Sequence, residues 1–155
     1  MKKSIDLIEM WYDGACEPKN PGGVASYGVI IKDGSKILFE ESKIVGSGAG
    51  MSNNVAEYSG AISGMEWLLQ NGFKKRKILV RGDNMMSVNQ MAGHWRVRTW
   101  DGLYVPFWRK ALELVKQFKR IEFKWIPREL NGEADEISKR ALKDSGVHFK
   151  IQPEG

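Results

Sequence analysis

The chain has 155 residues, 42% of them hydrophobic and 28% charged, which suits one soluble domain with a proper core of its own. No apolar run approaches the roughly 20 residues that a membrane helix needs, and a single cysteine, Cys16, rules out an internal disulfide. The net charge of +5 is too modest to indicate a polyanionic partner by itself.

The first ten residues, MKKSIDLIEM, carry charges within and after their apolar stretch, which is not the pattern of a secretory signal. No cluster of cysteine and histidine suggests a zinc site. We therefore expect a monomer in a reducing, cytoplasmic compartment. We expect neither a membrane partner nor an obligatory protein partner.

Three strands joined by short links open the chain. The first is rich in apolar and aromatic residues and stops at Asp13-Gly14, where the turn-rich segment 17–23 follows. Asp33-Gly34, between the second and third strands, is typical of a hairpin turn. The predicted strands span residues 5–12, 25–32 and 36–45, and their short connections favour an antiparallel meander.

A helix and a fourth strand come next. Asn53 or Asn54 can cap the helix, Asn71-Gly72 ends it, and apolar side chains recur at helical spacing between them. Its predicted core face is Tyr58, Ala61, Ile62, Met65, Leu68 and Leu69. The fourth strand covers 78–82 and ends at Asp83, and a short helical piece, 84–91, follows it.

The last third of the chain begins with an irregular segment, 92–102. After it we predict a helix from about 103 or 106 to 118, a fifth strand at 121–126, and a final helix at 133–143. We find no internal linker. We therefore predict one domain over residues 1–145 and a C-terminal tail over 146–155.

Basic and aromatic residues are interleaved between His94 and Arg128. This stretch holds nine Lys or Arg residues, only three acids, and four of the six tryptophans (Trp95, Trp100, Trp108 and Trp125). Such a mixture suits a polyanion whose sugars or bases stack on the aromatic rings. It equally suits a solvated helix face that covers core tryptophans, and the sequence leaves both interpretations open.

The order of elements, β-β-β-α-β-α-α-β-α, predicts an α/β fold of the mixed α+β kind. We expect a five-stranded mixed sheet whose first three strands are antiparallel, flanked by helices on its faces. Right-handed crossovers make the later strands parallel. If the fourth strand adds beside the first, Asp13 and Asp83 stand side by side.

Four acids occupy special places in this scheme. Asp13 and Asp83 end strands, whereas Glu57 and Asp135 lie in the first turns of helices, and such positions gather at one edge of an α/β sheet. Singly, Asp13 can cap a turn, Glu57 can complete a capping box with Asn54, and Asp135 can favour the helix dipole. Together they would repel one another without cations. Oxygen-only ligands suit Mg²⁺ or Mn²⁺, and two such ions are the standard apparatus for attack on a phosphodiester.

The segments YDGAC, NPGG, SNNVAEY, VRGDN and NGEADEISKRAL, in that order, resemble the type 1 ribonuclease H family from Leu7 to Leu142. The resemblance implies a ribonuclease H-like fold and an endonuclease that hydrolyses the RNA strand of RNA–DNA hybrids, leaving 5′-phosphate and 3′-hydroxyl ends. It implies that two Mg²⁺ ions, with Mn²⁺ as a substitute, are held by the catalytic carboxylates Asp13, Glu57, Asp83 and Asp135.

The resemblance also implies contacts with the hybrid. Asn20, Ser52, Asn53 and the backbone near Cys16 correspond to minor-groove contacts, and the segment from His94 to Arg109 resembles a shortened basic protrusion that grips the DNA strand. Two departures concern Asn84-Met85, where many members carry Ser and Gln, and the loop 127–130, which lacks the mobile histidine of many bacterial members. The candidate nucleic-acid contacts are Cys16, Asn20, Ser52, Asn53, Asn84, His94, Trp95, Arg96, Arg98 and Arg128.

Two alternatives share this fold. One is a non-catalytic nucleic-acid-binding module, against which the four intact acids argue. The other is a nuclease that acts on DNA, against which the minor-groove set implied by the resemblance argues, because such side chains can read the 2′-hydroxyl that distinguishes RNA. Excision from a reverse transcriptase is a third possibility, and the start at Met1 favours a free enzyme instead.

Overall fold

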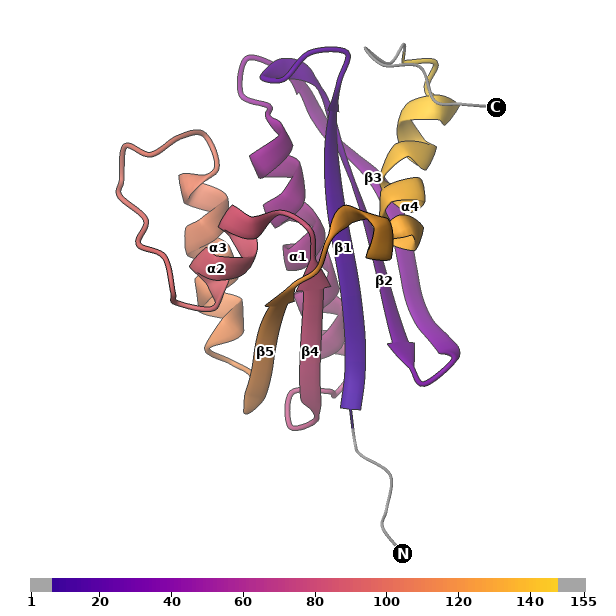
Figure 1. The fold of residues 1–155 in the computed structure, drawn as a ribbon, viewed down its shortest axis with the longest axis vertical. Coiled ribbons are helices and arrows are strands. Elements are labelled where there is room, and N and C mark those ends of the chain that lie inside the picture. The colour runs from indigo at the N-terminus through magenta and orange to yellow at the C-terminus, as the bar shows by residue number, and fades with distance from the viewer. Residues whose placement is uncertain (1–6, 148–155) are drawn as a thin grey trace, which may run out of the picture.

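The computed structural model describes residues 7–147, and within them one mixed sheet is flanked by helices (Figure 1). Its strands are β1 (Leu7–Glu17), β2 (Gly22–Asp33), β3 (Lys36–Gly48), β4 (Lys77–Gly82) and β5 (Arg120–Trp125). Its helices are α1 (Asn53–Gln70), α2 (Met85–Met91), α3 (Val105–Val115) and α4 (Gly132–Asp144), with a 3₁₀ turn, η1 (Arg128–Leu130), just before α4. The predicted tail lies outside the described residues from residue 148 onward.

The strand order is β3-β2-β1-β4-β5, which confirms the predicted five-stranded mixed sheet. β2 pairs antiparallel with β1 and β3, whereas β4 pairs parallel with β1, and β5 pairs parallel with β4. The fourth strand therefore does lie beside the first. Because these two strands are parallel, their carboxyl ends meet at one edge of the sheet.

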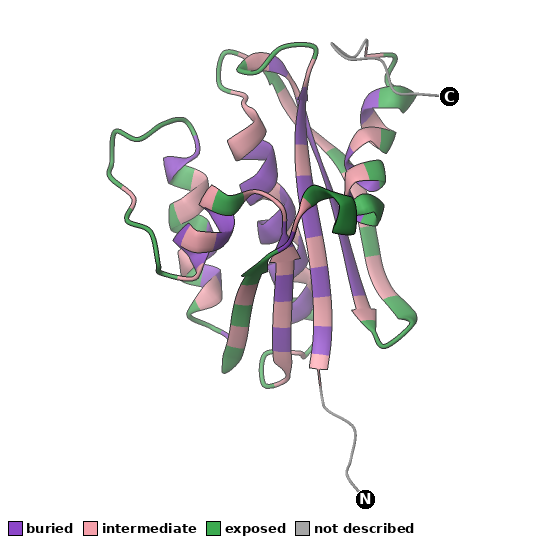
Figure 2. Cartoon of the chain, in the orientation of Figure 1, coloured by how far each residue is buried: buried purple, intermediate pink, exposed green. Residues whose placement is uncertain are grey.

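The helices cover the two faces of the sheet unequally. Ile8, Met10 and Tyr12 alternate along β1 and are buried in the core that α1 also lines. On the opposite face the Ser26 hydroxyl of β2 donates a 2.6 Å hydrogen bond to the Ser138 carbonyl of α4. Figure 1 shows α1 behind the sheet and α4 in front of it, and Figure 2 shows the burial along β1 and α1 against the largely exposed β5. Among the helices within residues 7–147, none combines the length and the apolar character that crossing a membrane requires.

β1 continues past Asp13 to Glu17, so the prediction that the first strand ends at Asp13 is wrong. Its ladder with β4 stops where Tyr12 faces Gly82, but its ladder with β2 runs on from Asp13 to Glu17. The partner strand β2 thus keeps the chain extended through a segment with turn-like composition. Asp13 is the first residue of β1 beyond the parallel ladder, and it therefore still lies at the carboxyl edge.

The start of α1 also differs from the prediction. Ser52, not Asn53 or Asn54, caps the helix, because its backbone is extended and its Oγ accepts a 3.2 Å hydrogen bond from the Val55 amide. Since α1 begins at Asn53, Glu57 lies beyond the first turn rather than in it. The helix start predicted for Asp135 is correct, because this residue lies in the first turn of α4.

Candidate active site

Asp13 lies in the interior of the carboxyl edge. Its side chain is only 5% exposed, and its Oδ1 accepts a 2.9 Å hydrogen bond from the Gly14 amide. Gly28 of β2 is its partner across the ladder. A carboxylate so placed is shielded from water on the sheet side, so its charge depends on what else the edge provides.

Glu57 is brought to Asp13 by close contact between α1 and β1. A Cβ on Gly14 would lie 2.5 Å from the Glu57 amide nitrogen, so only glycine lets the helix backbone approach the strand this closely. The Glu57 side chain is 2% exposed. Its Oε2 lies 3.5 Å from the Asn53 amide nitrogen Nδ2, and its buried Oε1 has no hydrogen-bond partner among residues 7–147.

Asp83 follows β4 directly and completes a triad. One carboxylate oxygen from each of Asp13, Glu57 and Asp83 lies within 4.8 Å of the others. Asp83 Oδ2 accepts a 3.3 Å hydrogen bond from Asn131 Nδ2, and its backbone carbonyl accepts a 3.1 Å bond from the Trp125 indole. Three acids from β1, α1 and the end of β4 therefore meet at one point.

Asp135 lies next to this triad rather than within it. At Gly28, β2 passes so close to α4 that a Cβ would lie 2.6 Å from the Ala134 carbonyl oxygen, and this contact sets the start of α4 against the edge. Asp135 Oδ1 is 3.2 Å from Lys139 Nζ one turn later. In this arrangement Lys139 pairs with the fourth acid, whereas Asp13, Glu57 and Asp83 form no ion pair with another residue of the range 7–147.

The proximity of the acids changes their protonation. Burial, followed by the charge of Asp83, raises the pKa of Asp13 from 3.8 to about 7. Burial, followed by the charge of Asp13, raises the pKa of Glu57 well above its usual value. Burial also raises the pKa of Asp83, although the hydrogen bond from Asn131 and the nearby Arg128 oppose the rise. Without a cation, this cluster retains protons near neutral pH.

Several of the predicted minor-groove residues lie beside the acids and contact one another. The Asn53 amide donates a 2.8 Å hydrogen bond to Asn20 Oδ1, which joins the loop before β2 to the start of α1. Asn84 Nδ2 donates a 3.1 Å bond to Asn54 Oδ1. Cys16 is buried, and its thiol donates to the Lys19 carbonyl, so this cysteine offers backbone rather than side chain to a ligand.

The predicted basic protrusion is the irregular connection between α2 and α3. His94, Trp95, Arg96 and Arg98 are all exposed on it. Its far end is anchored by Tyr104, whose hydroxyl accepts a 3.0 Å bond from Gln90, itself bonded to Tyr58. Trp95 and Trp100 are exposed, as stacking on a polyanion requires. Trp108 packs against the core, as the alternative of a solvated helix face over core tryptophans requires.

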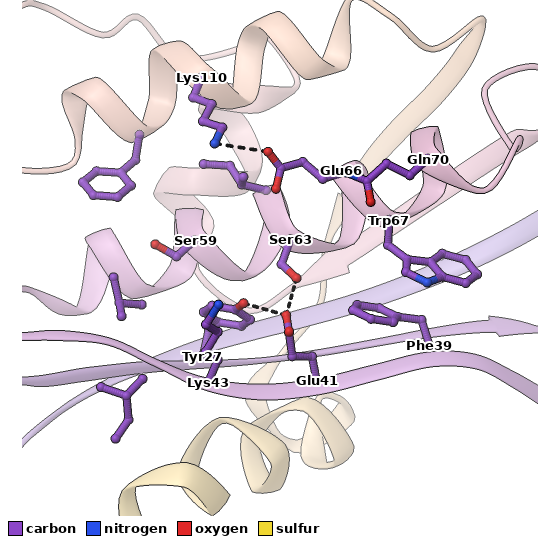
Figure 3. Close-up of a pocket in the computed structure, with 14 residues that line it drawn as sticks. Tyr27, Phe39, Glu41, Lys43, Ser59, Ser63, Glu66, Trp67, Gln70 and Lys110 are labelled. Atoms are coloured by element: carbon purple, nitrogen blue, oxygen red, sulfur yellow. Dashed lines mark hydrogen bonds and ion pairs between the residues drawn. The ribbon is translucent and has the colours of Figure 1, made fainter.

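A pocket of about 510 Å³ lies away from the acids, between α1, α3 and the strands β2 and β3 (Figure 3). Glu41, on its floor, accepts hydrogen bonds from Tyr27 (2.6 Å) and Ser63 (2.5 Å). Glu66 on α1 pairs with Lys110 on α3 at 3.1 Å. The carboxylates of this pocket are thus already partnered within the chain, and none of the predicted site residues lines it.

Comparison with known proteins identifies the family. The model of the reverse transcriptase-like family matches residues 11–141. The structure of LC11-RNase H1 in complex with an RNA/DNA hybrid is 30% identical in sequence and superposes with a TM-score of 0.78. The superposition includes 89% of this chain and 98% of that protein chain. The chain belongs to the type 1 ribonuclease H family.

Curated relatives of this ribonuclease H-family chain are often longer. The bifunctional protein Rv2228c of Mycobacterium tuberculosis is 36% identical over 127 residues, which are 79% of this chain but 32% of that protein. Ribonuclease HI of Halobacterium salinarum is 30% identical over 89% of this chain and 65% of its own length. The chain therefore spans about a third of the length of Rv2228c.

Family membership implies dependence on a divalent metal, and the acidic triad fits one. The site offers only oxygen donors, which suit hard divalent cations. The buried Oε1 of Glu57, unpartnered among the described residues, is an acceptor that a cation would satisfy. Asp13, Glu57 and Asp83 are accordingly the residues that would hold such an ion.

Asn131 is a site residue that the sequence analysis missed. It is 1% exposed and precedes α4, yet its side chain does not cap the helix. Instead Nδ2 is shared between the Tyr12 carbonyl (3.0 Å) and the Asp83 carboxylate (3.3 Å). One amide therefore ties together the carboxyl ends of β1 and β4. The position of Asn131, four residues before Asp135, gives no signal of this role, because its partners become visible only when the strands are placed.

Proposed function

We propose that this chain hydrolyses the RNA strand of RNA–DNA hybrids by two-metal-ion catalysis and leaves 5′-phosphate and 3′-hydroxyl ends. The observation that carries the proposal is the triad of carboxylates, two buried and one half-buried, at the carboxyl edge of a ribonuclease H fold. The ribonuclease H structure with a bound hybrid, which this chain resembles closely, supports the choice of substrate.

In this proposal, Asp13, Glu57 and Asp83 would hold the cations, and Asp135 would join them if it were released from Lys139. Two divalent ions held there would supply positive charge to activate the attacking water and to stabilise the leaving 3′ oxygen. Asn131 keeps Asp83 beside β1 by its shared hydrogen bonds. The burial of Asp13 and Glu57 excludes bulk water from the charged groups, which strengthens their interaction with the ions.

Recognition of the hybrid is assigned to the polar residues around the acids. Asn20 and Asn53, joined by a hydrogen bond, together with Ser52, suit a wide minor groove in which 2′-hydroxyls are displayed. Arg96, Arg98 and Trp95 on the exposed protrusion suit the phosphates and sugars of the DNA strand. Arg128, whose charge acts on Asp83, suits a phosphate close to the acids.

The test is parallel digestion of a labelled RNA–DNA hybrid, duplex RNA and duplex DNA with Mg²⁺. We expect cleavage of the RNA strand of the hybrid alone, and we expect Asp83→Asn to reduce its rate by roughly 100-fold or more, the scale of losing one preorganised electrostatic group. Asp33→Asn, an exposed acid of the β2–β3 hairpin, is the matched control and keeps the wild-type rate. Cleavage of duplex DNA instead would favour the DNA nuclease, and binding without Mg²⁺-dependent cleavage would favour the non-catalytic module.

We further propose Mg²⁺ as the preferred ion with Mn²⁺ as a substitute, a monomeric enzyme and a cytoplasmic location. Oxygen-only ligands support the choice of metal, and a single cysteine suits a reducing compartment. Metal titration of the cleavage rate, light scattering after size exclusion and fractionation of the source cells test the three statements separately.

A further inference from the structure

Two basic segments meet at the end of the sheet opposite the acids. Residues 74–77, KKRK, lead into β4, and residues 116–120, KQFKR, join α3 to β5. The Lys119 amide donates a 2.9 Å hydrogen bond to the Lys74 carbonyl, and Lys77 faces Arg120 across the β4–β5 ladder. Seven cationic residues thus gather at the start of two adjacent strands, and we call them the basic pole.

Five of these cations form no ion pair with any described residue. In the part of the chain that the structure describes, no ion pair involves Lys74, Lys75, Lys77, Lys119 or Arg120. Lys116 pairs with Glu113, and both side chains are largely exposed. The C-termini of α1 and α3 lie nearby, but a helix terminus contributes only about half a negative charge. Helix dipoles therefore neutralise a small part of the basic pole.

The surface around the cations selects the kind of polyanion. None of the large exposed apolar side chains within residues 7–147 belongs to segments 74–77 or 116–120. Membrane-surface segments usually carry apolar side chains that enter the lipid, and single-strand sites carry aromatic rings for base stacking. The basic pole offers neither of these. Its chemistry matches the phosphate backbone of a duplex, bound without regard to sequence.

Geometry separates this surface from the candidate active site. β4 has six residues and connects Lys77 to Asp83, so the basic pole and the acids lie roughly 20 Å apart along the strand direction. A duplex of about 12 base pairs is stiff on this scale, so a duplex that lies across the acidic end of the sheet does not bend round to the basic pole. We propose that the basic pole is a second duplex-binding surface, which holds a nucleic-acid segment separate from the one at the acidic edge, the carboxyl edge of the sheet where Asp13, Glu57 and Asp83 meet.

The test compares two variants with equal net charge. The first, Lys74→Ala/Lys75→Ala/Lys119→Ala, removes three cations of the basic pole. The control, Lys36→Ala/Lys43→Ala/Lys143→Ala, removes three other exposed lysines from β3 and α4. Binding of a labelled 12-base-pair hybrid is measured by sedimentation in EDTA at low salt, which prevents cleavage. We expect the first variant to bind one duplex fewer than the wild type. If it still binds two, we expect the duplex with the lower affinity to bind at least about tenfold less tightly than in the wild type.

The salt dependence gives a second readout. Each phosphate contact contributes about 0.9 to the slope of log K against log salt, so loss of up to three contacts lowers the slope by up to about 2.7. Equal binding and equal slope for the two triple variants would overturn the proposal, as would binding of wild type to anionic phosphatidylserine vesicles with duplex binding unchanged by the triple substitution.

Duplex binding at the basic pole can be tested independently of hybrid cleavage. If the acidic edge does not bind hybrids, the wild type binds one duplex and the first variant none, so the basic pole is still tested. If both surfaces bind, Mg²⁺-dependent cleavage of the same short hybrid stays within about twofold of wild type in the first variant, because the acidic edge is untouched.

Discussion

The charged side chains at the two ends of the sheet differ in their exposure to water. At the carboxyl edge, Asp13 and Glu57 are almost completely buried, and their pKa values rise because burial removes water and the neighbouring acids repel their charge. At the basic pole, Lys74 and Lys119 are exposed, and water solvates them fully. Buried like charges are costly to keep without a counter-ion, whereas exposed ones cost little. The acidic edge therefore indicates a bound metal far more strongly than the basic pole indicates its ligand.

The largest effect is expected from removing one buried acid. Asp13→Asn keeps the shape of the side chain but removes its charge, so we expect cleavage of a hybrid to fall about 1000-fold, as when a key electrostatic group is lost. The same change relieves repulsion, so the metal-free variant should be more stable than wild type at pH 8. Rate measurements with Mg²⁺ and urea unfolding in EDTA check the two effects, and a variant that is less stable yet active would contradict the description of the edge.

The stability of the metal-free protein should depend on pH in an unusual direction. The pKa of Asp13 is about 7 in the folded protein, above its value of 3.8. Between about pH 4 and 7, the folded state therefore holds a proton on Asp13 that the unfolded chain has lost. The contribution of this proton to the free energy of unfolding is lost as pH rises through 7. The loss of unfolding free energy amounts to about 4 kcal/mol at most, from 1.36 kcal/mol per pKa unit.

Urea unfolding in EDTA at pH 5.5 and 8 measures this effect. We expect lower stability at pH 8, and we expect saturating Mg²⁺ or the Asp13→Asn substitution to reduce the difference. A wild-type profile that is identical with and without the metal would show that the acids neither repel one another nor bind the ion.

Asn131 offers an intermediate effect. Both of its hydrogen-bond partners, the Tyr12 carbonyl and the Asp83 carboxylate, are acceptors, so the amide cannot be replaced by a carboxylate. Asn131→Ala leaves a buried acceptor unpaired and should cost about 1–3 kcal/mol of unfolding free energy. Asn131→Asp should lower the unfolding free energy of the Mg²⁺-free protein further. Addition of Mg²⁺ should restore part of the unfolding free energy that this variant has lost.

Urea unfolding with and without Mg²⁺ separates these outcomes. Asn71→Ala, which removes an exposed amide that bonds a single helix carbonyl, serves as the control with a much smaller effect. Equal behaviour of Asn131→Ala and Asn131→Asp at every metal concentration would mean that the residue acts only by filling space.

The smallest effect is expected at the basic pole. Lys119→Ala removes an exposed cation without an ion pair among the described residues, so the unfolding free energy should change by less than about 0.5 kcal/mol. Urea unfolding at pH 8 checks this. A loss of more than about 1 kcal/mol would show that the cation is structural, which would remove the contrast between the two ends.

The sequence predicts the parts of this arrangement that depend on local pattern and chain order. The spacing of apolar residues places Asp83 after a strand and Asp135 at a helix start, and the crossover rule makes the later strands parallel. The sequence leaves open whether β4 lies beside β1, and the structure shows that it does. The end of β1 is mispredicted because pairing with β2 overrides the turn-like composition after Asp13. Ser52 is missed as the cap because three consecutive polar residues, SNN, each suit that position.

Features that depend on tertiary contact escape sequence analysis. The role of Asn131 depends on two strand ends that are distant in the chain. The division of the tryptophans into exposed Trp95 and core-packed Trp108 depends on where α3 rests against α1. The individual roles of the predicted catalytic and nucleic-acid-binding residues remain predictions that the experiments above address.

Calorimetric titration of Mg²⁺ into the wild-type protein at pH 7, in two buffers of different ionisation enthalpy, tests the central claim most directly. Because Asp13 and Glu57 hold protons in the metal-free cluster, we expect metal binding to release protons, and hence a heat that differs between the two buffers, and Asp13→Asn to diminish both binding and release. Absence of binding at millimolar Mg²⁺, or binding that Asp13→Asn leaves unchanged, would contradict the assignment of the acidic edge as a metal site.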